Sequence, residues 1–183
     1  MILKEVIAYY TAHGGSLYCT MLDTTEAFGR VEYCCLMVCF ARIFHECTFI
    51  CFWIGIRTMW LVCHGICSHP FVVGSGVKQG GVISPILFCI YTDSLLCALH
   101  NSGVGCYTGH MFLGALAYAD DIVLLAPTPS VMRTMLALCD NFADDLYIVI
   151  SAKKSKCIHI GPRLTLPYCL PVLYWRYGYW ICG

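Results

Sequence analysis

Charged residues are scarce in this chain: Asp, Glu, Lys and Arg make up only 12% of its 183 residues, against about 25% in a typical soluble domain. The eleven basic residues balance the eleven acidic ones, so no strong field of one sign steers the chain to nucleic acid or anionic lipid. Apolar residues make up 59%, which offsets the entropy of ordering the chain and excludes intrinsic disorder. So much apolar surface predicts contact with a partner or with the remainder of a longer polypeptide.

The sequence also has no clean membrane span and no visible leader. A span needs about 20 mostly apolar residues with few charges, and the best candidate, residues 47–63, carries Arg57 near its middle. The N-terminus shows no basic region followed by an apolar run and a small-residue cleavage site. We therefore expect no membrane association and an intracellular location, in the nucleus or the cytoplasm. A small Cys-rich membrane protein is the alternative.

Paired cysteine motifs are missing too. The fifteen cysteines are odd in number, and no Cys-x-x-Cys occurs, so we expect reduced, mostly buried thiols rather than a disulfide framework. The residues Cys63, His64, Cys67 and His69 are of types that bind zinc, but their spacing matches no common zinc finger or ribbon. We therefore favour the interpretation that these are metal-free thiols in an apolar segment, beside exposed histidines.

Apolar runs and turn residues predict a mixed order of strands and helices. The expected strands cover residues 16–22, 71–73, 111–119, 122–126, 146–150 and 157–160. The expected helices cover one or two segments within 31–60, then 84 to about 99, and 131–143. Ser84 is expected as the N-cap of its helix and Pro85 as the first helical residue.

Without the region 31–76, the order is strand, helix, strand, strand, helix, strand, which is the split β-α-β unit of ferredoxin-like folds. We expect an α+β fold, with an antiparallel sheet backed by helices. Residues 162–183 hold three prolines and several Tyr and Trp. This aromatic-rich tail stays unassigned, and residues 1–161 are expected to form the domain.

Carboxylates embedded in apolar strands need an explanation, because burying them costs several kcal/mol unless cations or donors compensate. Asp120 and Asp121 lie between two apolar runs, and Asp23 ends another. In the expected fold the first strand and the central hairpin are neighbours, so three carboxylates converge at one edge of the sheet. Such a group binds hard divalent cations such as Mg²⁺, and two such ions promote phosphoryl transfer. The alternative is a turn in which both hairpin aspartates face water.

Four segments together resemble the motifs of reverse transcriptases. They are Tyr118-Ala119-Asp120-Asp121 between apolar strands; residues 22–31, where Asp23 is followed by Ala27-Phe28; residues 76–85, with Gln79-Gly80 and Ser84-Pro85; and residues 153–156, with Lys154-Ser155. The residues of these motifs are most similar to those of non-LTR (LINE-type) retrotransposon enzymes. The resemblance covers about residues 5–161 and implies a palm with a partial, mostly helical fingers insertion.

The resemblance implies a metal triad of Asp23, Asp120 and Asp121, which would hold two Mg²⁺ ions, or Mn²⁺ in their place. Because adjacent strand residues point to opposite faces, one of the paired aspartates is expected to ligate directly. Asp120 is the favoured one, with Asp121 at the margin. Lys154 is expected near the leaving pyrophosphate, as a cation or proton donor.

Three further residues are implied to contact the substrates. Phe28 would pack against the sugar of the incoming nucleotide and exclude a 2′-hydroxyl by bulk, although without the resemblance it would be taken for a core Phe. Gln79 and Gly80 would contact the incoming nucleotide and the template. The implied reaction is attack of a primer 3′-hydroxyl on a deoxynucleoside triphosphate opposite an RNA template. The implied partners are therefore an RNA template, a DNA primer, deoxynucleoside triphosphates and the remainder of a longer polyprotein.

The chain also departs from the family's usual residues at three motif positions. Gly29 stands where the family usually has Asp, Glu26 where it usually has Lys, and Ser151 where it usually has Asn. Nothing after residue 161 resembles the family's thumb. A catalytically inactive retroelement remnant of the same fold is therefore a second hypothesis beside the active polymerase.

Overall fold

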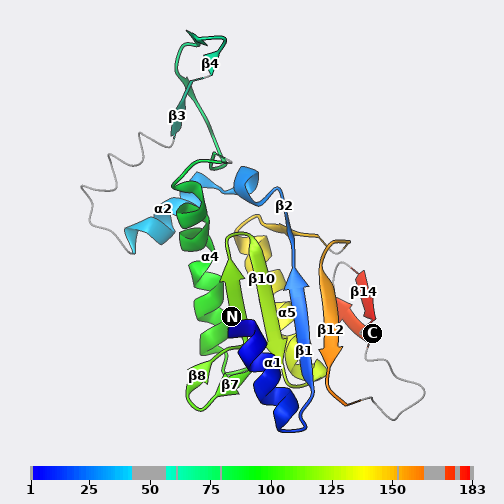
Figure 1. The fold of residues 1–183 in the computed structure, drawn as a ribbon. Coiled ribbons are helices and arrows are strands. Elements are labelled where there is room, and N and C mark those ends of the chain that lie inside the picture. Colours follow the sequence, from blue (N-terminus) through cyan, green and yellow to red (C-terminus); the bar gives the residue numbers. More distant parts are fainter. Residues whose placement is uncertain are drawn as a thin grey trace.

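A four-stranded antiparallel sheet forms the centre of the molecule (Figure 1). The structure is a computed structural model. It describes residues 2–42, 57–60, 62–78, 80–151 and 153–162, together with the backbone of 172–175 and 178–181. The strands of the sheet are β1 (Leu17–Leu22), β9 (Ala115–Tyr118), β10 (Asp121–Ala126) and β12 (Lys156–Ile160). Their order across the sheet is β12-β1-β10-β9, and every neighbouring pair is antiparallel.

Two helices cover one face of this sheet, and a third covers part of the other (Figure 1). Helices α4 (Ser84–Asn101) and α5 (Pro129–Asp145) contribute Leu99 and Met132 to a core shared with Leu22 and Leu124 of the strands. On the opposite face, α1 (Ile2–Ala12) packs through Val6 against a second cluster. The expected α+β fold, an antiparallel sheet backed by helices, is confirmed.

The remaining elements are short and surround the sheet. They are β2 (Thr24–Thr25) paired with β11 (Val149–Ile150), the 3-10 helix η1 (Ala27–Arg30), α2 (Tyr33–Ala41), β7 (Tyr107–Thr108) paired with β8 (Met111–Phe112), and β13 (Val172–Trp175) paired with β14 (Gly178–Ile181). A projecting arm holds β3 (Thr58–Met59) paired with β6 (Phe71–Val72) and β4 (Val62–Cys63) paired with β5 (Ile66–Cys67).

The expected strand 111–119 is divided in two. A Cβ at Gly114 would lie 2.5 Å from the Phe112 ring, so a larger residue at this bend would require that ring to move. Around it, the Leu113 amide bonds to the Cys106 carbonyl at 2.8 Å, and the Leu125 amide bonds to the Gly114 carbonyl at 2.7 Å. The chain therefore forms β8, turns, and joins the sheet only as β9.

The start of α4 differs from the expectation as well. Ser84 is the first residue of the helix rather than its N-cap, which is Ile83. The Ser84 hydroxyl donates to the Lys78 carbonyl instead of capping a helix amide. The hydroxyl therefore closes the loop that precedes the helix.

Other expectations hold more closely. The helix expected over 131–143 is α5, and the Thr128 hydroxyl caps it by accepting from the Val131 amide at 3.3 Å. The strand expected over 146–150 is wrong for its first part, because residues 146 and 147 form the turn that ends α5, and only β11 at 149–150 is a strand. Of the helical region expected within 31–60, α2 is confirmed, whereas residues 43–56 lie outside the described residues.

The structure bears on the expected absence of a membrane span and on the state of the thiols. Among the described residues, no helix combines the length and hydropathy needed to cross a membrane; most of the candidate segment 47–63 lies outside them. The cysteines in the described segments form no disulfide with one another, but the expectation that they are mostly buried is wrong, because as many of them are exposed as buried.

Candidate metal and nucleotide site

The three aspartates expected to act together come from neighbouring elements at one edge of the sheet. In the ladder between β1 and β10, Leu22 is paired with Ile122, so the next residue on each strand is an aspartate: Asp23 on one and Asp121 on the other. Asp120 lies in the two-residue turn between β9 and β10. The Thr24 hydroxyl, directly after Asp23, bonds to the Asp120 carbonyl at 3.5 Å.

The strand register also indicates which face of the sheet Asp23 and Asp121 occupy. Leu22 and Ile122 belong to the core under α4 and α5. Because side chains alternate along a strand, the neighbouring Asp23 and Asp121 belong to the opposite face. Asp121 is exposed, while Asp23 and Asp120 are half-buried. The expectation that Asp120 rather than Asp121 is the direct ligand stays a prediction.

One carboxylate oxygen at this edge is poorly satisfied. Oδ1 of Asp23 is buried and accepts no hydrogen bond. The Lys154 ammonium lies 3.5 Å from it, as an ion pair between partly exposed side chains. Across the residues that the structure describes, no three His, Cys, Asp or Glu side chains stand close enough together to hold a metal ion. The donor chemistry of Asp23 fits a hard cation, and the carboxylates are gathered at one edge without forming a closed metal cage.

The backbone of Asp23 is held on both sides by the loop that carries Lys154. The Asp23 amide donates to the Ser155 hydroxyl at 3.0 Å, and the Ser151 amide donates to the Asp23 carbonyl at 2.8 Å. Ser155 is 5% exposed. Sequence reasoning singled out Lys154 in this loop and missed the role of Ser155, because a small hydroxyl residue among lysines carries no signal by itself. The departure at Ser151 does not affect this contact, since a backbone amide makes it.

The tip of the acidic hairpin has an unusual backbone. Ala119 has φ of 52°, a left-handed conformation that glycine adopts readily and alanine does not. The preceding Tyr118 pairs with Asp121 across the turn. The strained two-residue turn therefore carries Asp120, and Asp121 directly follows it as the first residue of β10.

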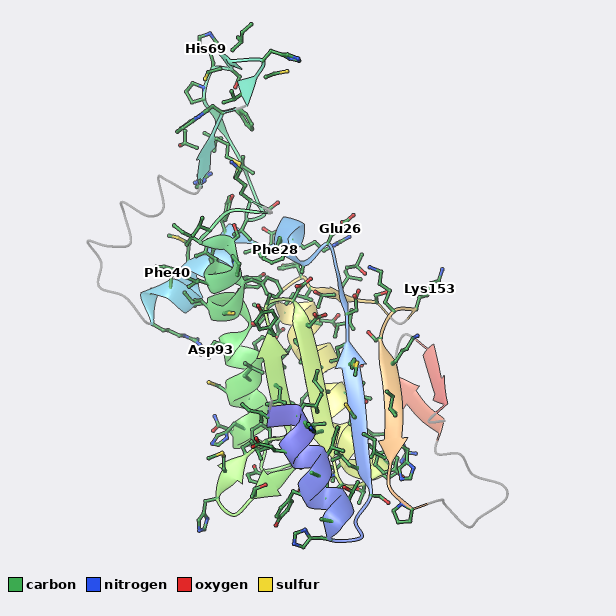
Figure 2. All side chains as sticks on the ribbon, in the orientation of Figure 1. Glu26, Phe28, Phe40, His69, Asp93 and Lys153 are labelled. Atoms are coloured by element: carbon green, nitrogen blue, oxygen red, sulfur yellow. The ribbon has the colours of Figure 1, made fainter. Side chains whose placement is uncertain are left out.

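Phe28 stands beside this edge on η1. Its ring lies 5.3 Å from the ring of Phe88 on α4, and its carbonyl accepts from the Val77 amide at 2.7 Å. The side chain is half-buried, so it packs on the core and still presents part of its ring. Figure 2 shows Glu26, Phe28 and Lys153 beyond the same end of the sheet.

The segment that precedes α4 packs directly on η1. Gly76 has φ of +85°, and a Cβ there would lie 3.0 Å from the Gly29 carbonyl oxygen. Gly80 has φ of +82°, is exposed, and has open space around its Cβ position. Gln79 lies outside the described residues, so its expected contact with nucleotide and template stays a prediction.

Two departures from the family's usual residues, Glu26 just before η1 and Gly29 within it, fit the structure around them. Glu26 has φ of 53° and pairs with Arg30, whose guanidinium lies 3.3 Å from its carboxylate. This arginine offsets the added negative charge. A Cβ at Gly29 would meet nothing within 4 Å, so the position has room for a side chain.

The zinc alternative on the projecting arm is not supported by its register. In the hairpin of β4 and β5, Cys63 pairs with Ile66 and Val62 pairs with Cys67. Cross-strand partners share a face and successive residues alternate, so the thiols of Cys63 and Cys67 point to opposite faces. They cannot both bind one ion without rebuilding the hairpin.

Comparison with known proteins identifies the relatives of this chain. The family model described as "Reverse transcriptase (RNA-dependent DNA polymerase)" matches residues 2–175. A retrovirus-related Pol polyprotein from the type-1 retrotransposable element R2 of Popillia japonica is 40% identical over 109 residues, which are 58% of this chain and 15% of that protein. The corresponding polyprotein of element R2DM from Drosophila melanogaster is 40% identical over 98 residues, 53% of this chain and 9% of that protein. The chain thus spans a small part of these relatives.

Solved structures of telomerase share the fold. Apo telomerase from Candida tropicalis, truncated from its C-terminal domain, superposes with a TM-score of 0.66 at 14% identity, over 90% of this chain and 35% of that one. Telomerase from Candida albicans, in complex with a fragment of telomeric RNA, gives 0.63 at 10% identity, over 96% of this chain and 31% of that one. At these identities the likeness concerns the fold alone.

Proposed function

Because the chain belongs to the reverse transcriptase family, we propose that it is the palm and part of the fingers of an RNA-directed DNA polymerase from a non-LTR retroelement. The observation that carries the proposal is the meeting of Asp23 with Asp121 and the Asp120 turn at one sheet edge. The 40% identity to R2 polyproteins supports the retroelement class.

The proposed metal ligands are Asp23, Asp120 and Asp121, which would hold two Mg²⁺ ions, or Mn²⁺ in their place. The buried, hydrogen-bond-free Oδ1 of Asp23 supports this, because an oxygen in that state is stabilised by a cation. When bound, such ions lower the pKa of an attacking hydroxyl and neutralise the leaving oxygen.

The chain's own residues are proposed to position the substrates. Lys154 supplies positive charge beside Asp23 and would face the leaving pyrophosphate. Phe28, supported from below by Phe88, would pack against the sugar of the incoming nucleotide. Gln79 and Gly80 would contact that nucleotide and the template. Catalysis would then rest mainly on positioning and on charge neutralisation.

The proposed partners are an RNA template, a DNA primer, deoxynucleoside triphosphates and the rest of a longer polyprotein. The last of these follows from the small share of the relatives that the chain spans. We propose residues 1–161 as the fingers and palm part, with 162–183 as a separate tail. The family match extends beyond 161, to residue 175. The hairpin of β13 and β14 lies beside α5 and β12, so the tail adjoins the palm.

Primer extension on an RNA template, with Mg²⁺ or Mn²⁺, tests the proposal. The wild-type chain should extend the primer, and the variant Asp120→Asn should not. Equal extension by the two proteins would contradict the catalytic assignment.

The second candidate, an inactive remnant of the same fold, is favoured by Gly29 standing where the family usually has Asp. The open space at the Gly29 Cβ position means that Gly29→Asp should fold normally. Extension by Gly29→Asp, with none by the wild type, would assign the loss of activity to this position. No gain would show that Gly29 is not its cause.

A further inference from the structure

The hydroxyl of Tyr91 joins three parts of the chain. Tyr91 lies in the middle of α4 and is fully buried, at 0% exposure. Its oxygen accepts the Glu32 amide at 3.3 Å and donates to the Leu146 carbonyl at 2.6 Å. Burial raises the pKa of this phenol far above its ordinary value, so the hydroxyl keeps its proton and serves as a fixed donor.

The first of these bonds holds the segment that carries Phe28. Glu32 follows η1 by two residues, and η1 ends at Arg30. Within η1, the Phe28 ring rests on Phe88, which lies one helical turn before Tyr91 on α4. Helix α4 therefore supports the half-buried ring of Phe28 from below and anchors the chain just beyond it through Tyr91.

The second bond holds the segment that leads to the Lys154 loop. Leu146 is the C-cap residue directly after α5, which ends at Asp145. Soon afterwards β11 pairs with β2, directly after Asp23. The Tyr91 hydroxyl is therefore bonded both to the segment that follows Phe28 and to the segment that leads to β11, which pairs with β2 next to Asp23.

We propose that Tyr91 is a positioning residue that acts through Phe28 on the choice between deoxyribo- and ribonucleoside triphosphates. This inference rests on the proposed function. A ring that excludes a 2′-hydroxyl by bulk discriminates only while its position is fixed within a fraction of an ångström. Removing the Tyr91 hydroxyl leaves a backbone amide and a carbonyl without their partner. The segment carrying Phe28 then relaxes, and the space beside the sugar widens.

The test compares Tyr91→Phe with Tyr10→Phe. The Tyr10 hydroxyl is a matched control, because it also makes two backbone hydrogen bonds, to the carbonyl and the amide of Tyr107, at 3.3 and 3.2 Å. It lies between α1 and β7, at the far end of the sheet from η1 (Figure 1). Dissociation constants are measured for 2-aminopurine deoxyribo- and ribonucleoside triphosphates. The chain is assembled with an RNA template and a chain-terminated DNA primer.

The Tyr91→Phe variant should reduce the ratio of ribonucleotide to deoxyribonucleotide dissociation constants by about tenfold, because a displaced Phe28 ring no longer clashes fully with the 2′-hydroxyl; misplacements of about 1 Å are known to have effects of up to about 10²-fold in enzyme sites. Tyr10→Phe should leave the ratio unchanged. In a Phe28→Ala background, Tyr91→Phe should have no further effect on it, because Tyr91 acts through that ring.

A second variant removes the same bond from its other side. Glu32 has φ of −76°, close to the value that proline imposes, so Glu32→Pro deletes the donor while the Tyr91 side chain stays in place. It should lower the ratio as Tyr91→Phe does, which keeps the test decisive if Tyr91→Phe fails to fold. Wild-type discrimination in both variants would overturn this inference alone. A wild-type chain that binds neither nucleotide would contradict the proposed function and the inference together.

Discussion

The ammonium group of Lys154 lies 3.5 Å from Oδ1 of Asp23, an oxygen that accepts no hydrogen bond. A cationic side chain therefore stands where the proposed function needs a metal ion. The lysine side chain is 69% exposed, so it can swing away into solvent. If the proposed function is right, Lys154 and a divalent cation compete for the same oxygen.

Replacing Lys154 with glutamine should therefore strengthen metal binding and weaken catalysis. We expect Mn²⁺ to bind Lys154→Gln about two- to fivefold more tightly, the range set by a partly exposed ion pair. Electron paramagnetic resonance of Mn²⁺, without nucleotide, measures this directly. The neighbouring Lys153 is exposed, and Lys153→Gln is the matched control. Equal Mn²⁺ affinity in both variants and the wild type would refute the competition.

The loop around Lys154 offers a second matched pair of variants. Ser155→Ala removes the side-chain oxygen that accepts the Asp23 amide and should lower the free energy of unfolding by about 1 kcal/mol. Ser151 holds Asp23 through its backbone amide, so Ser151→Ala should change stability by less than about 0.5 kcal/mol. Urea denaturation measures both. Similar losses in the two variants would show that the Ser155 hydroxyl is not the anchor.

Gly76→Ala tests the packing of the segment before α4 on η1. Its φ of +85° is unfavourable for alanine, and its Cβ would lie 3.0 Å from the Gly29 carbonyl oxygen. Gly80 has a similar φ of +82° with nothing near its Cβ position, so Gly80→Ala carries the conformational cost alone, of order 1–3 kcal/mol. We expect Gly76→Ala to lower the thermal unfolding midpoint further than Gly80→Ala does. A smaller effect at Gly76 would show that η1 and this segment are not in tight contact.

Alkaline pH should weaken the fold through Cys19. Burial raises the pKa of this thiol from 9.0 to about 11, with Cys157 and Cys106 adding to the rise. A folded-state pKa above the unfolded one means that the contribution is complete below pH 9 and is lost as pH rises through 11. The stability advantage of the wild type over Cys19→Ala, from urea denaturation, should therefore shrink between pH 9 and 11. A constant advantage across that range would contradict the raised pKa.

The order of the main elements and the place of the acids follow from local patterns. Short apolar runs bounded by turn residues predict β1, β9 and β10, and apolar residues at helical spacing predict α5. A carboxylate that ends an apolar strand is costly in any fold, which is why Asp23 and the hairpin aspartates stand out without a structure. Their meeting at one edge then follows from the split β-α-β order.

Contacts between distant segments leave no such pattern, and only the tertiary structure decided them. The Ser155 hydroxyl holds Asp23, and the Tyr91 hydroxyl holds Glu32 and Leu146, although a buried Ser or Tyr looks the same in a sequence with or without a partner. At the break between β8 and β9, the Leu125 amide donates to the Gly114 carbonyl. The apolar pattern of each segment alone indicated which of its residues are buried, because burial selects apolar residues position by position. The pairing of polar groups across the fold depends on the approach of elements far apart in the chain, which no single segment encodes.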